Sequence, residues 1–269
     1  MSNPTDPADP KGVVARGYDK IARRYLEWSA LRPSPARRHY LELACARIPP
    51  GSTVLELGCG AGLPMTKALA DGRDVTGVDI SATQIALARR NVPGATFIQS
   101  DMTTLAFDDA RFDAVVAFYS LTHVPREELP GLLGRIRRWL RRGGILIATM
   151  GVEDDPGGIE KDWLGVDMYF SHFSARKNRR LVEAAGFAIE EADVVAEPED
   201  RHGARFLWIV AVATAALVVI AACQPGGATP SPAAPEGTSP GATVPGIVPT
   251  PALEPSPVEP GFGSPVPSS

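Results

Sequence analysis

The sequence predicts an α/β fold in which helices cover both faces of a doubly wound, mostly parallel sheet. The main observation is that short apolar segments alternate with amphipathic segments from about residue 53 to residue 150. This β-α repeat is typical of a parallel sheet. Two further helical segments precede the repeat, and a proline-rich tail follows it. A chain of 269 residues is long enough to build one large domain of this kind.

The N-terminal part predicts a helical cap. Apolar and aromatic residues recur at helical spacing over Gly17–Ala30, and Arg38–Ile48 forms a second amphipathic segment that ends at a Pro-Pro-Gly turn. The segment Met1–Pro10 contains three prolines and two aspartates and no apolar run. It does not resemble a signal peptide, and residues 1–16 are expected to form a disordered N-terminus.

The repeat itself predicts five strands connected mainly by helices. The expected strands are Thr53–Leu57, Asp74–Val78, Ala95–Gln99, Phe112–Phe118 and Ile145–Met150. The expected helices are Leu63–Ala70, Ser81–Arg90, Glu127–Leu140 and, later, Ser174–Ala185. Phe187–Val195 and Arg205–Ala211 then form a closing antiparallel pair. In such a sheet, ligands bind beyond the carboxyl ends of the parallel strands.

Composition and charge exclude several classes of protein. With 27 Lys+Arg, 31 Asp+Glu and a net charge of -4, the chain is neither a polybasic nucleic-acid binder nor an acidic disordered protein. The basic run Arg135–Arg142 lies at the end of a predicted helix, where cations are favourable, so no nucleic-acid partner is expected. The three cysteines, Cys45, Cys59 and Cys223, match neither a disulfide framework nor a metal site. A cytoplasmic body in a reducing compartment is expected.

The C-terminal part leaves two alternatives open. Phe206–Ala222 has no charged residue and is a candidate transmembrane helix, but its first residues overlap the last predicted strand. The segment either supplies that strand or anchors the chain to a membrane near its C-terminus, and Cys223 directly after it also resembles a lipidation site. Residues 224–269 hold 13 of the 26 prolines and few charges, which predicts a disordered tail.

The most specific motif follows the first predicted strand. It reads VLELGCGAGL and places the acidic residue Glu56 ahead of glycines at positions 58, 60 and 62. Glycines let a ligand approach the main chain, and the N-terminus of the following helix offers unpaired N–H groups to an anionic group. Asp79 ends the second strand, where a carboxylate can accept hydrogen bonds from a ribose. The pattern indicates a nucleoside-containing cofactor.

The spacing of the glycines distinguishes two cofactors. A dinucleotide fingerprint has the form G-x-G-x-x-G, whereas position 63 is leucine, so the spacing disfavours NAD. The motif resembles the first motif of the class I S-adenosylmethionine-dependent methyltransferase family, V-L-E-L-G-C-G-x-G. Further similarities follow at Val78–Ser81, Ser100–Met102 and Phe112–Val116. The resemblance implies a methyltransferase domain over residues 17–211, a Rossmann-like seven-stranded sheet with an antiparallel last strand between its neighbours, and S-adenosylmethionine as cofactor.

The resemblance also implies a set of cofactor-binding residues. By this resemblance, the main chain from Gly58 to Gly62 faces the methionyl part of the cofactor, and Glu56 lies beneath this loop. Asp79 holds the ribose and Asp101 accepts a hydrogen bond from the adenine amino group. The complete set is Tyr18, Glu56, Gly58, Cys59, Gly60, Gly62, Asp79, Ile80, Asp101, Met102 and Phe118. Of these, Ile80 and Met102 enclose the adenine ring, and Tyr18 closes over the cofactor.

Each of these assignments has a structural alternative. Asp79 can cap the helix that follows it, and Asp101 can be a carboxylate of an ordinary turn. Tyr18 can be a packing residue of an amphipathic helix. Cys59 has no neighbour in sequence that would activate its thiol, so it is expected to be a small packed residue.

Methyl transfer from a sulfonium depends chiefly on the alignment of donor and acceptor. Where the acceptor must also lose a proton, the candidate bases are His123 and His172, with Tyr119 and Tyr169 as orienting residues. Otherwise these histidines form walls of the site. Aromatic residues in Trp163–Phe173 suggest an insert that shapes a small, partly apolar acceptor site.

The sequence therefore predicts a methyltransferase that acts on a small-molecule substrate, without nucleic acid and with membrane association through residues 206–222 as one alternative. Two other functions stay open. One is an NAD(P)-dependent oxidoreductase, and the other is a membrane-tethered or lipidated protein that binds the cofactor without catalysis.

Overall fold

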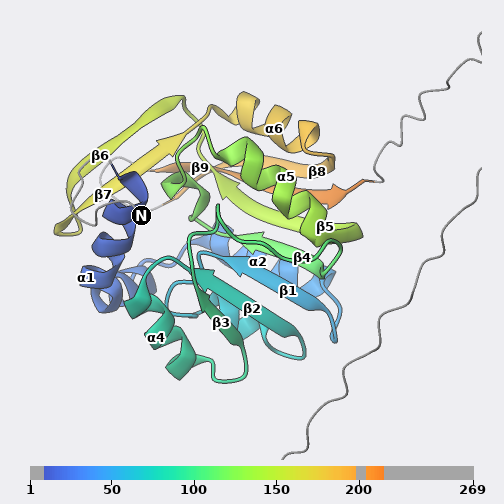
Figure 1. Cartoon of the computed structure of the whole chain (residues 1–269), viewed down its shortest axis with the longest axis horizontal. Coiled ribbons are helices and arrows are strands. Elements are labelled where there is room, and N and C mark those ends of the chain that lie inside the picture. The colour runs from blue at the N-terminus through green and yellow to red at the C-terminus, as the bar shows by residue number, and fades with distance from the viewer. Residues whose placement is uncertain (1–8, 198–203, 215–269) are drawn as a thin grey trace, which may run out of the picture. The chain divides into compact units, whose positions relative to one another are not determined.

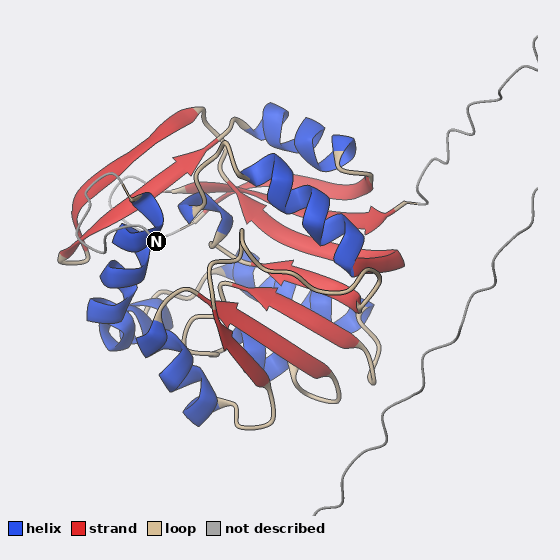
Figure 2. Cartoon of the chain, viewed as in Figure 1, coloured by secondary structure: helices blue, strands red, loops and turns tan. Residues whose placement is uncertain are grey.

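The computed structural model describes residues 9–197 and 204–214, which form a seven-stranded sheet between layers of helices (Figures 1 and 2). The strands of this sheet are β1 (Thr53–Leu57), β2 (Asp74–Asp79), β3 (Thr96–Gln99), β4 (Phe112–Ala117), β5 (Leu140–Met150), β8 (Phe187–Ala196) and β9 (Arg205–Ala213). Their order is β3-β2-β1-β4-β5-β9-β8, with the first five parallel and β9 antiparallel to both of its neighbours. The predicted doubly wound sheet with an inserted antiparallel last strand is confirmed.

Helices cover both faces of the sheet (Figure 2). The helices are α1 (Pro10–Ala30), α2 (Pro35–Arg47), α3 (Met65–Leu69), α4 (Ala82–Asn91), α5 (Leu129–Trp139) and α6 (Ala175–Ala184), with a 3-10 turn η1 at Leu121–His123. One apolar core lies between the sheet and α5 and α6, and a second lies between the opposite face and α2 and α3. Because both faces are covered, the central strands are apolar along most of their length.

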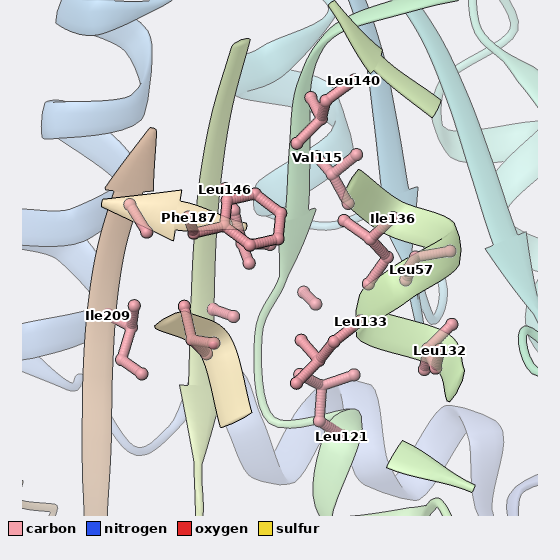
Figure 3. Packing of buried hydrophobic residues seen from close by; sticks show 14 of the residues in the cluster. Leu57, Val115, Leu121, Leu132, Leu133, Ile136, Leu140, Leu146, Phe187 and Ile209 are labelled. Atoms are coloured by element: carbon pink, nitrogen blue, oxygen red, sulfur yellow. The ribbon is translucent and has the colours of Figure 1, made fainter. Parts of the chain in front are cut away.

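The larger core holds the central strands in place. Leu132, Leu133 and Ile136 of α5 are fully buried and pack over Leu57 of β1 and Val115 of β4 (Figure 3). These side chains recur at helical spacing along α5, so one face of the helix supplies the contact. This packed layer therefore fixes the positions of the carboxyl ends of β1 and β4.

A cap lies beyond the ends of the parallel strands. It consists of α1 and a hairpin of β6 (Asp155–Trp163) and β7 (Val166–His172), which pack against each other (Figure 1). Met168 of β7 is fully buried with Val14 and Ile21 of α1. Arg24 of α1 donates a hydrogen bond to the Leu164 carbonyl in the hairpin turn at 2.6 Å. The helical cap expected from the sequence thus includes an antiparallel hairpin, which the sequence did not predict.

The N-terminal boundary of the cap differs from the prediction. Helix α1 begins at Pro10, so residues 10–16, which were expected to be disordered, are helical. Asp9 is the N-cap and accepts a hydrogen bond from the Gly12 N–H at 3.1 Å, and proline is favourable at the first helical position. Residues 1–8 lie outside the described residues.

Other element boundaries move by a few residues. Helix α5 begins at Leu129 rather than Glu127. Strand β5 extends back to Leu140, so Gly143 and Gly144 lie within the strand rather than in a turn. The register between β4 and β5 shifts in this region, which accommodates the irregular start of the strand.

The structure decides between the alternatives for the first part of the apolar C-terminal segment. Arg205–Ala213 forms β9 in the sheet interior, and its Trp208 and Val210 are fully buried. Across the described ranges 9–197 and 204–214, no helix has the length and apolar character needed to cross a membrane. The rest of the candidate membrane segment, Cys223 and the tail predicted to be disordered lie outside the described residues.

Candidate active site

Two adjoining cavities lie between the cap and the carboxyl ends of the parallel strands. The first has a volume of about 670 Å³ and the second about 530 Å³, in each case including space that is open to solvent. Among the predicted site residues, the first cavity is lined by Tyr18, Gly58, Gly60, Asp79, Ile80, Asp101, Met102, Phe118 and His123. The second is lined by Glu56, Gly58, Cys59, Gly60 and Phe118. The structure therefore gathers most of the predicted residues around one continuous site.

The glycine loop forms the floor between the two cavities. Gly58 has a φ of +77°, and a Cβ atom at this position would lie 2.2 Å from the Cβ of Ser120. Ser120 in turn donates a hydrogen bond from its Oγ to the Leu57 carbonyl at 2.7 Å, so its side chain cannot give way easily. Gly60 has a φ of +55°. Glycine is needed at these positions because side chains rarely adopt this conformation and would fill the approach to the main chain.

Two predicted residues of the loop face the protein interior. A Cβ atom at Gly62 would lie 3.2 Å from Val92 and 3.5 Å from Ala88, and Gly62 lines neither cavity. Gly62 thus packs closely against α4, and its predicted contact with a cofactor stays a prediction. Cys59 is buried and lines the second cavity, and burial raises the pKa of its thiol well above the usual value. A thiol in this state is a packed residue rather than a nucleophile, as the sequence suggested.

Asp79 connects the glycine loop to the second strand. Its Oδ2 accepts a hydrogen bond from the Gly60 N–H at 2.9 Å, and its Oδ1 accepts one from the Ser81 N–H at 2.9 Å. Ser81, not Asp79, is the N-cap of α4, with its Oγ accepting from the Gln84 N–H. Burial raises the pKa of Asp79 to about 6. The side chain is thus a fixed carboxylate at neutral pH that lines the first cavity.

Glu56 lies below the loop, as expected. Its Oε2 accepts a hydrogen bond from Thr66 Oγ1 at 2.5 Å, and burial raises the pKa of Glu56 to about 8. The carboxyl group is therefore mostly protonated at pH 7. It joins β1 to α3 on the floor of the second cavity.

Asp101 is held by a lysine of the cap. Lys11 Nζ lies 2.7 Å from Asp101 Oδ2, 2.8 Å from Glu128 Oε2 and 2.9 Å from Thr103 Oγ1. Asp101 also accepts hydrogen bonds from the N–H and the hydroxyl of Thr103, both at 2.8 Å. The carboxylate that the family resemblance assigns to the adenine amino group therefore also connects α1 to the loop after β3.

His123 and Tyr18 form a hydrogen-bonded pair in the first cavity. His123 Nδ1 lies 2.8 Å from the Tyr169 carbonyl, which can only accept, so Nδ1 carries the proton. Burial lowers the pKa of His123 to about 4, so the ring is neutral at pH 7 and Nε2 is an acceptor. Tyr18 accordingly donates its hydroxyl hydrogen to His123 Nε2 across 2.9 Å.

The second predicted histidine lies elsewhere. His172 ends β7, and its Nδ1 is 2.6 Å from the Glu153 carbonyl. Its ring packs over Gly151, where a Cβ atom would approach it to 2.3 Å, and it lines neither cavity. His172 therefore lies apart from the residues that line the two cavities, and we propose a structural role for it.

Several lining residues carry no signal in the glycine motif. Lys11 and Arg37 come from α1 and α2, and Tyr119 follows β4 with a φ of +58°. Arg37 lines the second cavity and donates from Nη2 to the Ser29 and Arg32 carbonyls. Lys11 and Arg37 reach the site only through the packing of α1 and α2, so a local sequence motif does not reveal them, whereas Tyr119 was predicted as an orienting residue. Over the described parts of the chain, no three His, Cys, Asp or Glu side chains come together as a metal site.

Comparisons with known proteins agree with this geometry. Residues 54–144, from β1 into β5, match the family model described as a methyltransferase domain. A demethylmenaquinone methyltransferase from Beutenbergia cavernae is 34% identical over 150 residues, which cover 54% of this chain and 58% of that protein. The chain spans between 51% and 62% of the length of the first curated relatives that it matches.

Solved structures share the fold. The 1,6-didemethyltoxoflavin-N1-methyltransferase from Burkholderia thailandensis, crystallised with 1,6-didemethyltoxoflavin and S-adenosylhomocysteine, superposes with a TM-score of 0.59 at 22% identity, over 80% of this chain and 93% of that one. The [4+2]-cyclase SpnF superposes with a TM-score of 0.61 at 20% identity, over 76% and 96% of the two chains. Residues 54–144 thus match a methyltransferase domain in sequence, and the glycine loop and the sheet order are similar to those of class I S-adenosylmethionine-dependent methyltransferases, whose cofactor is S-adenosylmethionine.

Proposed function

We propose that the chain transfers a methyl group from S-adenosylmethionine to a small organic acceptor. The observation that carries the proposal is the hydrogen bond between Asp79 and the Gly60 N–H. It joins the bare main chain of the glycine loop to a fixed carboxylate in the wall of one cavity. A nucleoside with a charged amino-acid arm needs both features, one for its ribose and one for close approach to the arm.

The residues around the cavities fit the parts of this cofactor. The side of the first cavity with Asp79, Ile80, Asp101 and Met102 offers hydrogen-bond acceptors and two apolar side chains to an adenosine. The second cavity offers the guanidinium of Arg37 to a carboxylate. Gly58 and Gly60 line both cavities, which agrees with a ligand that spans the two.

The proposed mechanism depends on position and on exclusion of water. S-adenosylmethionine, when bound, supplies the methyl group on a sulfonium centre. The glycine loop and Asp79 fix the donor end, and Tyr18 and Tyr25 of α1 line the first cavity. Holding the two reacting atoms in line can supply much of the rate enhancement. His123, reached through Tyr18, can accept the proton that an acceptor hydroxyl loses.

The acceptor is proposed to be small because the site is enclosed by this chain's own cap. Curated relatives include methyltransferases named for demethylmenaquinone, for malonyl-[acyl-carrier protein] and for sterols. Their range supports an organic acceptor as a class and does not select one compound. We also propose that the methyltransferase domain extends from α1 to β9, and that it works in the cytoplasm, since Cys45 and Cys59 are free thiols.

The proposal is tested by calorimetry followed by methyl transfer. The full chain should bind S-adenosylhomocysteine and not NADH, and it should transfer a radiolabelled methyl group to the small-molecule fraction of a cell extract. An Asp79→Asn variant should lose cofactor affinity, while Asp74→Asn, a matched change at the exposed start of the same strand, should retain it. Tight NADH binding would reject the proposal. Cofactor binding without transfer to any acceptor would favour a non-catalytic protein.

A further inference from the structure

Most of the described side chains that line the first cavity are uncharged. Among the described residues, three charged side chains line it, namely Lys11, Asp79 and Asp101. Asp79 is bound to the glycine loop. Lys11 and Asp101 are 2.7 Å apart, and Glu128 at 2.8 Å balances the lysine further. The neutral part of the described lining includes Val14, Tyr18 and Tyr25 of α1 together with Phe118, His123 and Val124.

This distribution of charge discriminates between acceptors. A carboxylate or an ammonium group placed among neutral, mostly apolar side chains loses its hydration without gaining a partner of opposite charge, which disfavours its binding. An uncharged acceptor avoids that cost. Since His123 is a neutral imidazole, it also adds no charge before the reaction.

The shape of the same region favours a flat acceptor. Tyr18 and Tyr25 meet edge to face, with ring centroids 5.3 Å apart and an interplanar angle of 80°. Tyr18 and His123 are also 5.3 Å apart, at 88°. Trp163 lies behind both tyrosines at 5.9 Å, so the rings restrain one another. Aromatic side chains locked in this manner form a rigid wall on which a planar ring can stack or meet edges.

The hydrogen bonds of Tyr18 and His123 indicate which functional group of the acceptor receives the methyl group. His123 Nδ1 is committed to the Tyr169 carbonyl, and Nε2 accepts from the Tyr18 hydroxyl. This arrangement can take a proton from a donor in the cavity, because Tyr18 can pass its own hydrogen to Nε2 as it accepts another. It offers no cation to an anionic acceptor. A hydroxyl group is the acceptor function that matches it.

On the basis of the proposed function, we propose that the acceptor is an uncharged aromatic compound with a ring hydroxyl, methylated on that oxygen. The hydroxyl proton passes to Tyr18 Oη while the Tyr18 proton passes to His123 Nε2. The acceptor oxygen forms its bond to the methyl carbon as the sulfur–methyl bond breaks, and the electron pair of that bond stays on sulfur. The imidazolium then releases the proton to water, so the products are the methyl ether, S-adenosylhomocysteine and one proton.

Three probes that share one ring test the proposal. They are 2-naphthol, 2-naphthoate and 2-naphthylmethylamine, which at pH 7 are neutral, anionic and cationic. Calorimetry with S-adenosylhomocysteine alone comes first, because failure at this step rejects the proposed function itself. Titration of each probe into the protein with S-adenosylhomocysteine should then give naphthol binding at least tenfold tighter than either charged probe. Labelled S-adenosylmethionine should yield the naphthyl methyl ether.

If naphthoate or the amine binds as tightly as naphthol or more tightly, the inference is overturned. It is also overturned if naphthol binding is undetectable. Neither result rejects the proposed function. A variant designed to change the order of affinities for the three probes provides a second readout. Tyr25→Arg adds a cation to the cavity wall at a half-buried position and should shift the preference toward naphthoate. Ala30→Arg adds the same side chain at an exposed position of α1 and should leave the order of the probes unchanged.

The proton transfer has its own test. Tyr18→Phe keeps the ring and removes the hydroxyl, so it should lower kcat for naphthol about 100-fold with little change in naphthol affinity. It should also change the pH profile of kcat. An unchanged kcat would show that Tyr18 is only a wall of the cavity and would overturn the proposed proton path.

Discussion

Asp79 and Gly60, 19 positions apart in the sequence, are joined by a hydrogen bond of 2.9 Å between the carboxylate and the loop N–H. The bond closes the turn after β1 onto the end of β2, and it uses one oxygen of a carboxylate that also lines the first cavity. The same side chain can thus fix the loop and bind a ligand. This double role makes Asp79 the most sensitive position of the candidate site.

Replacement of Asp79 should weaken cofactor binding. In Asp79→Asn the side chain keeps its size, but its amide replaces one acceptor oxygen with a donor. The expected loss in S-adenosylhomocysteine affinity is about 1–3 kcal/mol, or roughly 5- to 150-fold in Kd. Calorimetry measures it, with Asp74→Asn as the matched control. If the two variants bind S-adenosylhomocysteine equally well, Asp79 has only a structural role in the loop.

Glu56 should make stability depend on pH. Burial raises the pKa of Glu56 to about 8 from an ordinary value of 4.5, so the folded chain holds a proton that the unfolded chain releases. The resulting stability is complete below about pH 4.5 and is lost as the pH rises through about 8, by at most about 5 kcal/mol. The contribution of Asp79 to stability is also lost as the pH rises, but over a lower pH range, because burial raises the pKa of Asp79 to about 6.

A conservative variant isolates the contribution of Glu56. Glu56→Gln keeps an oxygen that accepts from Thr66 and removes the titration. Its free energy of unfolding, measured in urea from pH 5 to pH 9, should fall less steeply with pH than that of the wild type. Glu42→Gln changes an exposed carboxylate on α2 and should follow the wild-type curve. Parallel curves for Glu56→Gln and the wild type would mean that Glu56 titrates normally.

The two histidines should respond differently to truncation. His123→Ala removes the acceptor of the Tyr18 hydroxyl and should lower the rate of labelled methyl transfer about 100-fold, with little effect on cofactor binding. His172→Ala removes a ring that packs on Gly151 outside both cavities, so turnover should stay near the wild-type value. A larger loss of turnover in His172→Ala than in His123→Ala would reverse this assignment.

Lys11 should stabilise the cap. Its ammonium group connects α1 to Asp101 and to Glu128 at the start of α5, and these side chains are only partly shielded from solvent. Lys11→Met leaves two neighbouring carboxylates without their cation, and the free energy of unfolding should fall by about 1 kcal/mol. Lys20→Met, at an exposed position of the same helix, is the control. If both variants unfold at the same urea concentration, the bridge does not contribute to stability.

The sheet and the glycine loop could be predicted because their signals are local. Buried parallel strands are apolar throughout, and the loop glycines at 58 and 60 occupy positive φ. The start of α1 was not predicted, although Asp9 and Pro10 are a favourable N-cap and first helical residue. The prolines of the first ten residues instead suggested a loose terminus, which was wrong for Pro10.

The hairpin and part of the site could not be predicted from local patterns. Strand β6 includes Glu160, Lys161 and Asp162, and it lacks the apolar alternation typical of a half-buried strand. The hairpin is stabilised by tertiary contacts such as that of Met168 with α1. For the same reason, the positions of Lys11 and Arg37 at the cavities depend on how the cap packs rather than on a motif.

The most direct test of the account is a crystal structure of the protein grown with S-adenosylhomocysteine. The ribose hydroxyls are expected to donate to Asp79, the adenine to lie between Ile80 and Met102, and the amino-acid arm to cross the main chain of Gly58 toward Arg37. A nucleoside bound elsewhere, or one whose ribose makes no contact with Asp79, would contradict it.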